Sequence, residues 1–186
     1  MSAAGKQRLL DAIAAGKPFV GFHSAADTFH SAGERNERQT QVDPYVAMIG
    51  GEFIVHGAQQ ESSLLLTSRF PGANGIGVGE AIAFTEEWYT FKNFAPDLHV
   101  IFVQETQMMK GPCYQRPNFP ATWARMHGKG RVFYTSLGHR DDIWSNPFFQ
   151  AITLGGFAWA MGRAEADITP NIDKVTPLAN QLAKKI

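Results

Sequence analysis

The sequence has 186 residues, 44% of them hydrophobic, and its 17 basic residues balance its 17 acidic ones. That length supports one globular domain with its own core and is too short to favour two. The charged residues form no run of either sign, so the sequence argues against nucleic acid or an anionic membrane as a partner. It favours a small neutral molecule.

Neither cysteine usage nor hydropathy points to an exported or membrane protein. The one cysteine, Cys113, cannot form an internal disulfide, which favours a reducing compartment. No stretch approaches the roughly 20 apolar residues of a membrane span, and no signal-peptide pattern opens the chain. The cytoplasm is therefore the default compartment.

Helical and strand-like segments alternate in the first part of the chain. Residues 3–15 carry apolar side chains at a helical period, and Gly16 supplies the stop. The apolar run 18–22 is too short for a helix, and its continuity predicts a parallel strand buried on both faces. A polar loop over residues 29–43 and a short helix over residues 44–49 follow.

Strands dominate the middle of the chain. We predict them over residues 52–57, 62–67, the start of 80–91, and 98–104. The glycine-rich residues 70–79 lack both the P-loop and the dinucleotide-binding pattern, so we assign them no phosphate-binding role. Residues 122–126 and 131–136 predict a hairpin, and residues 146–162 a helix that starts at an Asn-Pro pair.

The interleaved elements predict an α/β fold with a mixed sheet and helices on both faces. We expect the hairpin to be an antiparallel addition at one edge of this sheet. Prolines interrupt the pattern after the last long helix. The expected organisation is a domain over residues 1–163 and a C-terminal tail over residues 164–186 packed on it.

Polar residues stand where two of the predicted strands end. His23 follows the 18–22 strand, and His139 follows the second strand of the hairpin. In open α/β sheets, ligands bind at the carboxyl ends of the strands. If the two strands are parallel neighbours, both imidazoles lie at one rim of the sheet and form the first candidate site.

Four sequence blocks resemble the ThuA-like family, which is named for trehalose utilisation. They are GFHSAADT at residues 21–28, GGEF with a histidine at residues 50–56, EWY at residues 87–89, and GRVFYTSLGH at residues 130–139. The resemblance runs from Lys6 to Gly162. It implies a flavodoxin-like, class I glutamine-amidotransferase-like fold and a role in carbohydrate breakdown, on glycosides or oxidised 3-keto glycosides.

The sequence departs from the family pattern at several points. Two βα units that usually precede the first helix are missing, so we expect either a shortened chain or strands supplied by another chain, because a sheet edge would otherwise stay unpaired. The missing signal peptide accordingly carries little weight. Gly57 stands where a proline is usual, Glu86 where an aspartate is usual, and Phe70 where a histidine is common.

The resemblance does not extend to the amidotransferase reaction. That reaction needs a cysteine thiolate at the sharp turn after the strand, where this chain has His23. Cys113 lies in a proline-rich loop instead. We therefore expect the scaffold without the amidotransferase chemistry.

The candidate chemistry is general acid–base catalysis on a sugar by His23, His139 and Glu87, because imidazoles and carboxylates exchange protons near neutral pH. The reaction would be that of a hydrolase, lyase or isomerase. Residues expected to bind the substrate are Ser24, Asp27, His56, Trp88, Tyr89 and Arg140.

Three alternatives stay open. The histidines could simply cap strands and bind loops. His23, His56 and His139 with a carboxylate could instead hold a zinc-type ion in a metal-dependent hydrolase, although no HxH or HExxH spacing supports this and no cofactor is firmly predicted. The third alternative is a non-catalytic carbohydrate-binding or structural module. The sequence also leaves open whether the chain forms a homo-oligomer.

Overall fold

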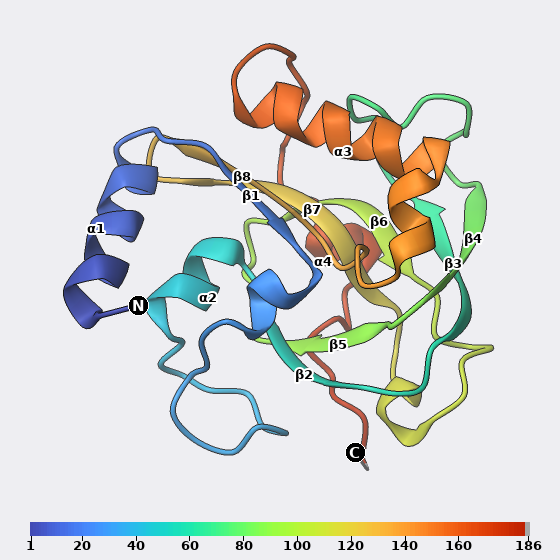
Figure 1. Cartoon of the computed structure of the whole chain (residues 1–186). Helices are drawn as coiled ribbons and strands as arrows, with labels where there is room; N and C mark the ends of the chain where they lie inside the picture. The colour runs from blue at the N-terminus through green and yellow to red at the C-terminus, as the bar shows by residue number, and fades with distance from the viewer. Residues whose placement is uncertain (185–186) are drawn as a thin grey trace.

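A six-stranded sheet forms the middle layer of the computed structural model, which describes residues 1–184 (Figure 1). In spatial order its strands are β1 (Phe19–Phe22), β8 (Gly130–Thr135), β7 (Phe119–His127), β6 (His99–Gln104), β3 (Gln60–Leu66) and β4 (Ala81–Glu86). β1 pairs in parallel with β8, and every other pair is antiparallel. A separate two-stranded sheet pairs β2 (Glu52–His56) with β5 (Tyr89–Lys92).

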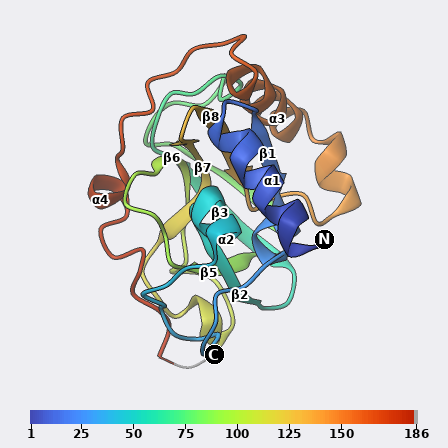
Figure 2. The ribbon, with the colours of Figure 1, turned by 90° about the vertical axis from the view of Figure 1, so that its left-hand side faces the viewer.

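Helices cover both faces of the large sheet (Figure 2). α1 (Ala3–Ala14) and α2 (Pro44–Ile49) bury their apolar side chains in one core, which includes Trp123 and Tyr134 of the sheet. α3 (Pro147–Ala160) packs on the other face, where Phe149 and Phe133 belong to a second core. Within the described residues, no helix is long and apolar enough to cross a membrane.

The short elements follow the strands and the last long helix. They are the 3-10 turns η1 (His23–Asp27), η2 (Pro112–Tyr114) and η3 (Asp141–Ser145), and the helix α4 (Ile172–Val175). After α3 the chain runs back across the molecule to the sheet. There the Asn171 side chain accepts a hydrogen bond from the amide of Val100 at 2.7 Å, and the Asn180 side chain accepts one from the amide of Phe94 at 2.9 Å.

The mixed sheet with helices on both faces is confirmed, and two expectations about its strands are wrong. The hairpin β7–β8 lies inside the sheet and not at an edge, since β8 pairs with β1 and β7 pairs with β6. β1 is itself an edge strand of the described chain, and Phe19, Val20 and Phe22 are only partly buried. A short apolar run looks the same in an edge strand as in a central one, so the sequence could not separate them.

Residues 80–91, for which the sequence predicted a strand only at the start, contain two strands in different sheets. β4 ends at Glu86 and β5 begins at Tyr89, so Glu87 and Trp88 form the link between the sheets. Because the chain leaves one sheet and enters the other here, the backbone of Glu87 pairs in neither hydrogen-bonded ladder. This break places a carboxylate over the rim where β1 and β8 end.

We predict that Gly155→Ala destabilises the protein, although alanine is the better helix former. A Cβ at residue 155 would lie 1.8 Å from the carbonyl oxygen of Pro71, and a backbone atom cannot turn away as a side chain does. Overpacking costs about 1–3 kcal/mol, against a gain of at most about 1 kcal/mol in helix propensity. Urea denaturation should therefore show a lower free energy of unfolding.

Leu154→Ala is the matched control in the same helix. The side chain of Leu154 is exposed, so its truncation should change the free energy of unfolding by no more than about 0.5 kcal/mol. A Gly155→Ala protein as stable as the wild type would contradict the close contact between α3 and the segment at residue 71.

Candidate functional site

The parallel pairing of β1 with β8 brings two histidines to one rim. β1 runs straight into η1, whose first residue is His23, and β8 is followed by the turn that carries His139. Their ring centroids lie 5.2 Å apart. His23 has a backbone φ of 39°, a conformation that a bulky residue adopts only where the surrounding structure holds it.

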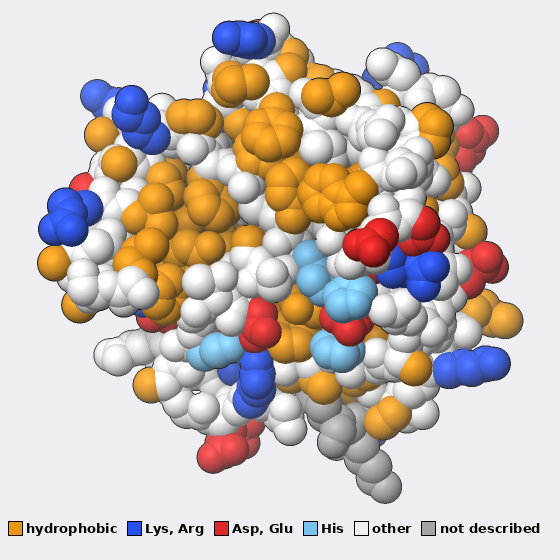
Figure 3. Space-filling model, in the orientation of Figure 1, with side chains coloured by type: hydrophobic (Ala, Val, Ile, Leu, Met, Phe, Trp, Pro, Cys, Tyr) orange, Lys and Arg blue, Asp and Glu red, His pale blue; other side chains and the backbone are white. Residues whose placement is uncertain are grey.

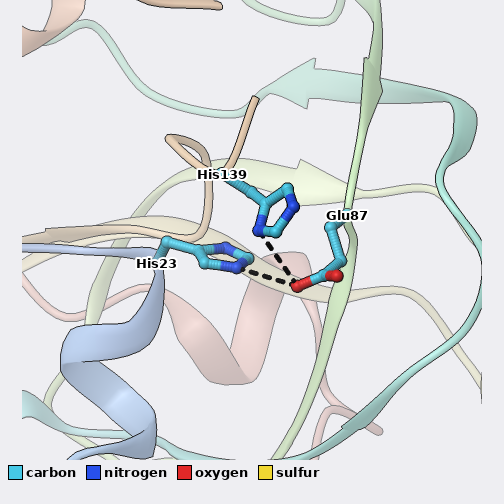
Figure 4. Close-up of side chains that lie close together, drawn as sticks. All are labelled: His23, Glu87 and His139. Atoms are coloured by element: carbon cyan, nitrogen blue, oxygen red, sulfur yellow. Dashed lines mark hydrogen bonds and ion pairs between the residues drawn. The ribbon is translucent and has the colours of Figure 1, made fainter. Parts of the chain in front are cut away.

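The carboxylate of Glu87 lies between these imidazoles (Figure 4). Its Oε2 is 3.1 Å from Nε2 of His23 and 3.3 Å from Nδ1 of His139. Its other oxygen, Oε1, is 3.4 Å from Nδ1 of His56 at the end of β2. The structure thus brings three predicted histidines and the predicted carboxylate into one cluster, which we call the Glu87 cluster. Figure 3 shows the histidines gathered with acidic side chains on one face.

The two contacts of the His23 ring show that a positive charge is needed between His23 and Glu87. Nδ1 of His23 is 2.9 Å from the carbonyl oxygen of Ser136, which can only accept, so Nδ1 carries a proton. A neutral imidazole would then turn the lone pair of Nε2 toward a carboxylate oxygen. Two lone pairs would face each other in that case, so a positive charge is required between Nε2 of His23 and Oε2 of Glu87. Either a second proton or a metal ion can supply it.

Glu86, the residue before Glu87, holds the backbone that carries His139. Its side chain is fully buried, and Oε1 accepts hydrogen bonds from the amides of Gly138 and His139 at 2.8 Å each. Oε2 accepts one from the amide of Glu87 at 2.7 Å. Sequence reasoning missed this role. The only available signal was two adjacent acidic residues at the end of an apolar strand.

Aromatic rings line the inner side of the Glu87 cluster. The ring of Tyr89 lies 3.8 Å from that of His23 and 3.9 Å from that of Phe53, centroid to centroid. Burial, with the negative charges of Asp27 and Glu87, raises the pKa of Tyr89 to about 12. The phenol therefore stays protonated. Its hydroxyl makes no hydrogen bond to any residue that the structure describes, but Tyr89 is only 5% exposed, so it can donate only to a group that reaches the inner side of the cluster.

Of the other residues predicted to bind substrate, Asp27 and Arg140 are held in ion pairs and Ser24 is exposed. Asp27 accepts a hydrogen bond from Arg35 at 2.8 Å and lies 2.9 Å from His30. Ser24 is exposed on the same 3-10 turn. Arg140 binds Asp142 through Nε at 2.9 Å and lines an open pocket next to His139.

Trp88 requires a correction. Its side chain is fully buried in the core, and its indole N–H donates to the carbonyl oxygen of Gln60 at 2.8 Å. It therefore cannot stack on a sugar, because the link between β4 and β5 turns its ring inward while Glu87 turns outward.

Three side chains of the Glu87 cluster could hold a metal ion. One donor atom each from His23, Glu87 and His139 lie within 4.8 Å of one another. His56, which the sequence suggested as the third histidine ligand, does not belong to this group. The donor set that the structure offers is two imidazoles and one carboxylate.

With this geometry in place, residues 1–160 match the family model of ThuA, described as trehalose utilisation. The chain belongs to the ThuA family. This membership gives the chain a carbohydrate-associated role related to trehalose utilisation. Among curated proteins, none matches.

Solved structures similar to this ThuA chain share its fold. A ThuA-like protein from Parabacteroides merdae is 18% identical, with a TM-score of 0.59 over 87% of this chain and 67% of that one. The β-galactosidases from Bacillus circulans sp. alkalophilus and Rahnella sp. R3 are each 14% identical, with TM-scores of 0.54. They match 84% and 86% of this chain, which spans only 20% and 21% of theirs. At these identities the likeness concerns the fold alone.

We predict that Glu86→Gln loosens the turn that carries His139. Glutamine keeps the shape but loses the charge and one acceptor oxygen, so the amides of residues 138 and 139 lose charge-assisted hydrogen bonds, worth about 1.5–3 kcal/mol each. Hydrogen exchange of these amides should accelerate, and the free energy of unfolding should fall. Glu61→Gln, at an exposed carboxylate on β3, should change neither. Unaltered exchange at both amides would contradict the positioning role of Glu86.

Proposed function

We propose that this ThuA chain converts a glycoside or a keto-sugar by proton transfer at the Glu87 cluster, as a hydrolase, lyase or isomerase. The observation that carries the proposal is the meeting of two imidazole nitrogens on one carboxylate oxygen, at the rim where β1 and β8 end. A carboxylate that orients an imidazole is a recurring arrangement in general acid–base catalysis.

His139 is the imidazole that reaches the substrate. Its side chain is 38% exposed, against 8% for His23. When Nδ1 of His139 donates to Glu87, Nε2 keeps its lone pair and faces away from the carboxylate. That nitrogen can take a proton from a sugar hydroxyl or from carbon next to a keto group, and return it later in the reaction.

His23 acts through Glu87. Both of its ring nitrogens are engaged, one with the carbonyl of Ser136 and one with the carboxylate, so it fixes the charge and the position of Glu87. The Tyr89 hydroxyl and the Asp27–Arg35 pair lie beside it and offer hydrogen bonds to sugar hydroxyls. The expected substrate is a neutral, hydroxyl-rich molecule.

The competing function is a module that binds a carbohydrate without converting it. The same exposed histidines, phenol and ion pair would serve in either case. Incubation with a panel of disaccharides and their 3-keto derivatives separates the two functions, because only an enzyme changes the sugar.

We predict that His139→Asn and Glu87→Gln each lower kcat by about 100-fold or more, since each removes one member of the proton-transfer pair. Steady-state assays on the sugar that the wild type converts provide the measurement, with far-UV circular dichroism to check the fold. His127→Asn, in the hairpin turn away from the cluster, should leave kcat unchanged. Wild-type kcat in both cluster variants would rule out the proposed reaction centre.

We also predict that Cys113→Ala retains full activity and that no glutaminase activity accompanies it. Cys113 lies in η2 and is buried, and burial raises the pKa of its thiol. A thiol of this kind is a poor nucleophile. Loss of turnover in a folded Cys113→Ala protein would instead indicate thiol chemistry.

A further inference from the structure

Three donor side chains of the Glu87 cluster lie close together at the rim of the sheet. Nε2 of His23, Nδ1 of His139 and a carboxylate oxygen of Glu87 lie within 4.8 Å of one another. We propose that they bind one divalent first-row cation of zinc type. The proposal rests on the proposed function for its location. It goes further by naming the ion that supplies the positive charge at that site.

The distances between donors suit such an ion. Metal–ligand bonds of about 2.0–2.1 Å in a tetrahedral site place neighbouring donors about 3.3 Å apart. Oε2 of Glu87 lies 3.1 Å from Nε2 of His23 and 3.3 Å from Nδ1 of His139. These two spacings match those of a tetrahedral site, and the third, between the two imidazole nitrogens, lies within 4.8 Å.

Hydrogen bonds to residues outside the donor set hold these ligands in the orientation that an ion needs. A metal-bound imidazole usually donates its second N–H to a backbone carbonyl or a carboxylate. Nδ1 of His23 does so to Ser136 at 2.9 Å, which leaves the lone pair of Nε2 directed at the site. The backbone of His139 is fixed in turn by the buried carboxylate of Glu86.

A metal ion is one of the two ways to supply the positive charge that the cluster needs. The lone pair of His23 and the carboxylate oxygen face each other, and a divalent cation satisfies both together with His139. Two imidazoles and one carboxylate leave a fourth position open, as in hydrolytic zinc sites. That position would lie toward the exposed side of the cluster. His23, His139 and Glu87 then act as ligands, so in the metal-bound site His139 does not exchange the proton assigned to it in the metal-free site.

The test is metal analysis of the full chain with matched variants. Chelator-treated protein is dialysed against Zn²⁺ or Co²⁺, the bound metal is counted by elemental analysis, and the visible Co²⁺ spectrum reports four-coordinate geometry. We expect one ion per chain in the wild type and in His127→Ala. We expect at least about tenfold weaker binding in His139→Ala and Glu87→Gln.

The outcomes separate this inference from the proposed function. Protein that binds no ion but converts a sugar overturns the metal site and leaves the acid–base enzyme in place. One ion per chain that is lost in both cluster variants, with no turnover of any sugar on the panel, supports the metal site and overturns the proposed enzyme. Equal binding by wild type and cluster variants places the ion elsewhere and also overturns the inference.

Discussion

The site depends on one contact, the carboxylate of Glu87 between the imidazoles of His23 and His139. It can form only because β1 and β8 are parallel neighbours, so that the residues after both strands emerge at the same rim. It also needs the break between β4 and β5, which frees Glu87 from both ladders. Two sheets and three distant chain segments thus determine the position of a single carboxylate.

Two adjacent glutamates serve different purposes because their surroundings differ. Glu86 is sealed in the protein, and backbone amides surround its oxygens, so fixed dipoles stabilise its charge. Glu87 faces imidazoles, which can carry either protons or a metal ion. The first carboxylate therefore shapes the turn under His139, and the second is the one that we propose for proton transfer or metal binding.

Local sequence patterns predicted the features that depend on interactions between residues close together in the chain. The Asn-Pro start of α3 was visible because Asn146 caps the helix through its own side chain. The rule that ligands bind at the carboxyl ends of strands identified His23 and His139 as candidates. The position of the hairpin inside the sheet and the pairing of β2 with β5 depend on contacts between distant segments, and no short pattern encodes them. For the same reason the inward turn of Trp88 and the clamp formed by Glu86 could not be predicted.

The turn after β1 holds one side chain at the rim of the sheet. A glutamine amidotransferase would need a cysteine nucleophile at a turn of this kind, and here the turn carries His23 at a positive φ. Its imidazole is fixed by Ser136 and directed at Glu87. A side chain held at both nitrogens is suited to keeping a proton or an ion in place and unsuited to attacking a carbonyl carbon. The turn therefore displays one side chain at the rim, and the neighbours of that side chain hold it at both ring nitrogens.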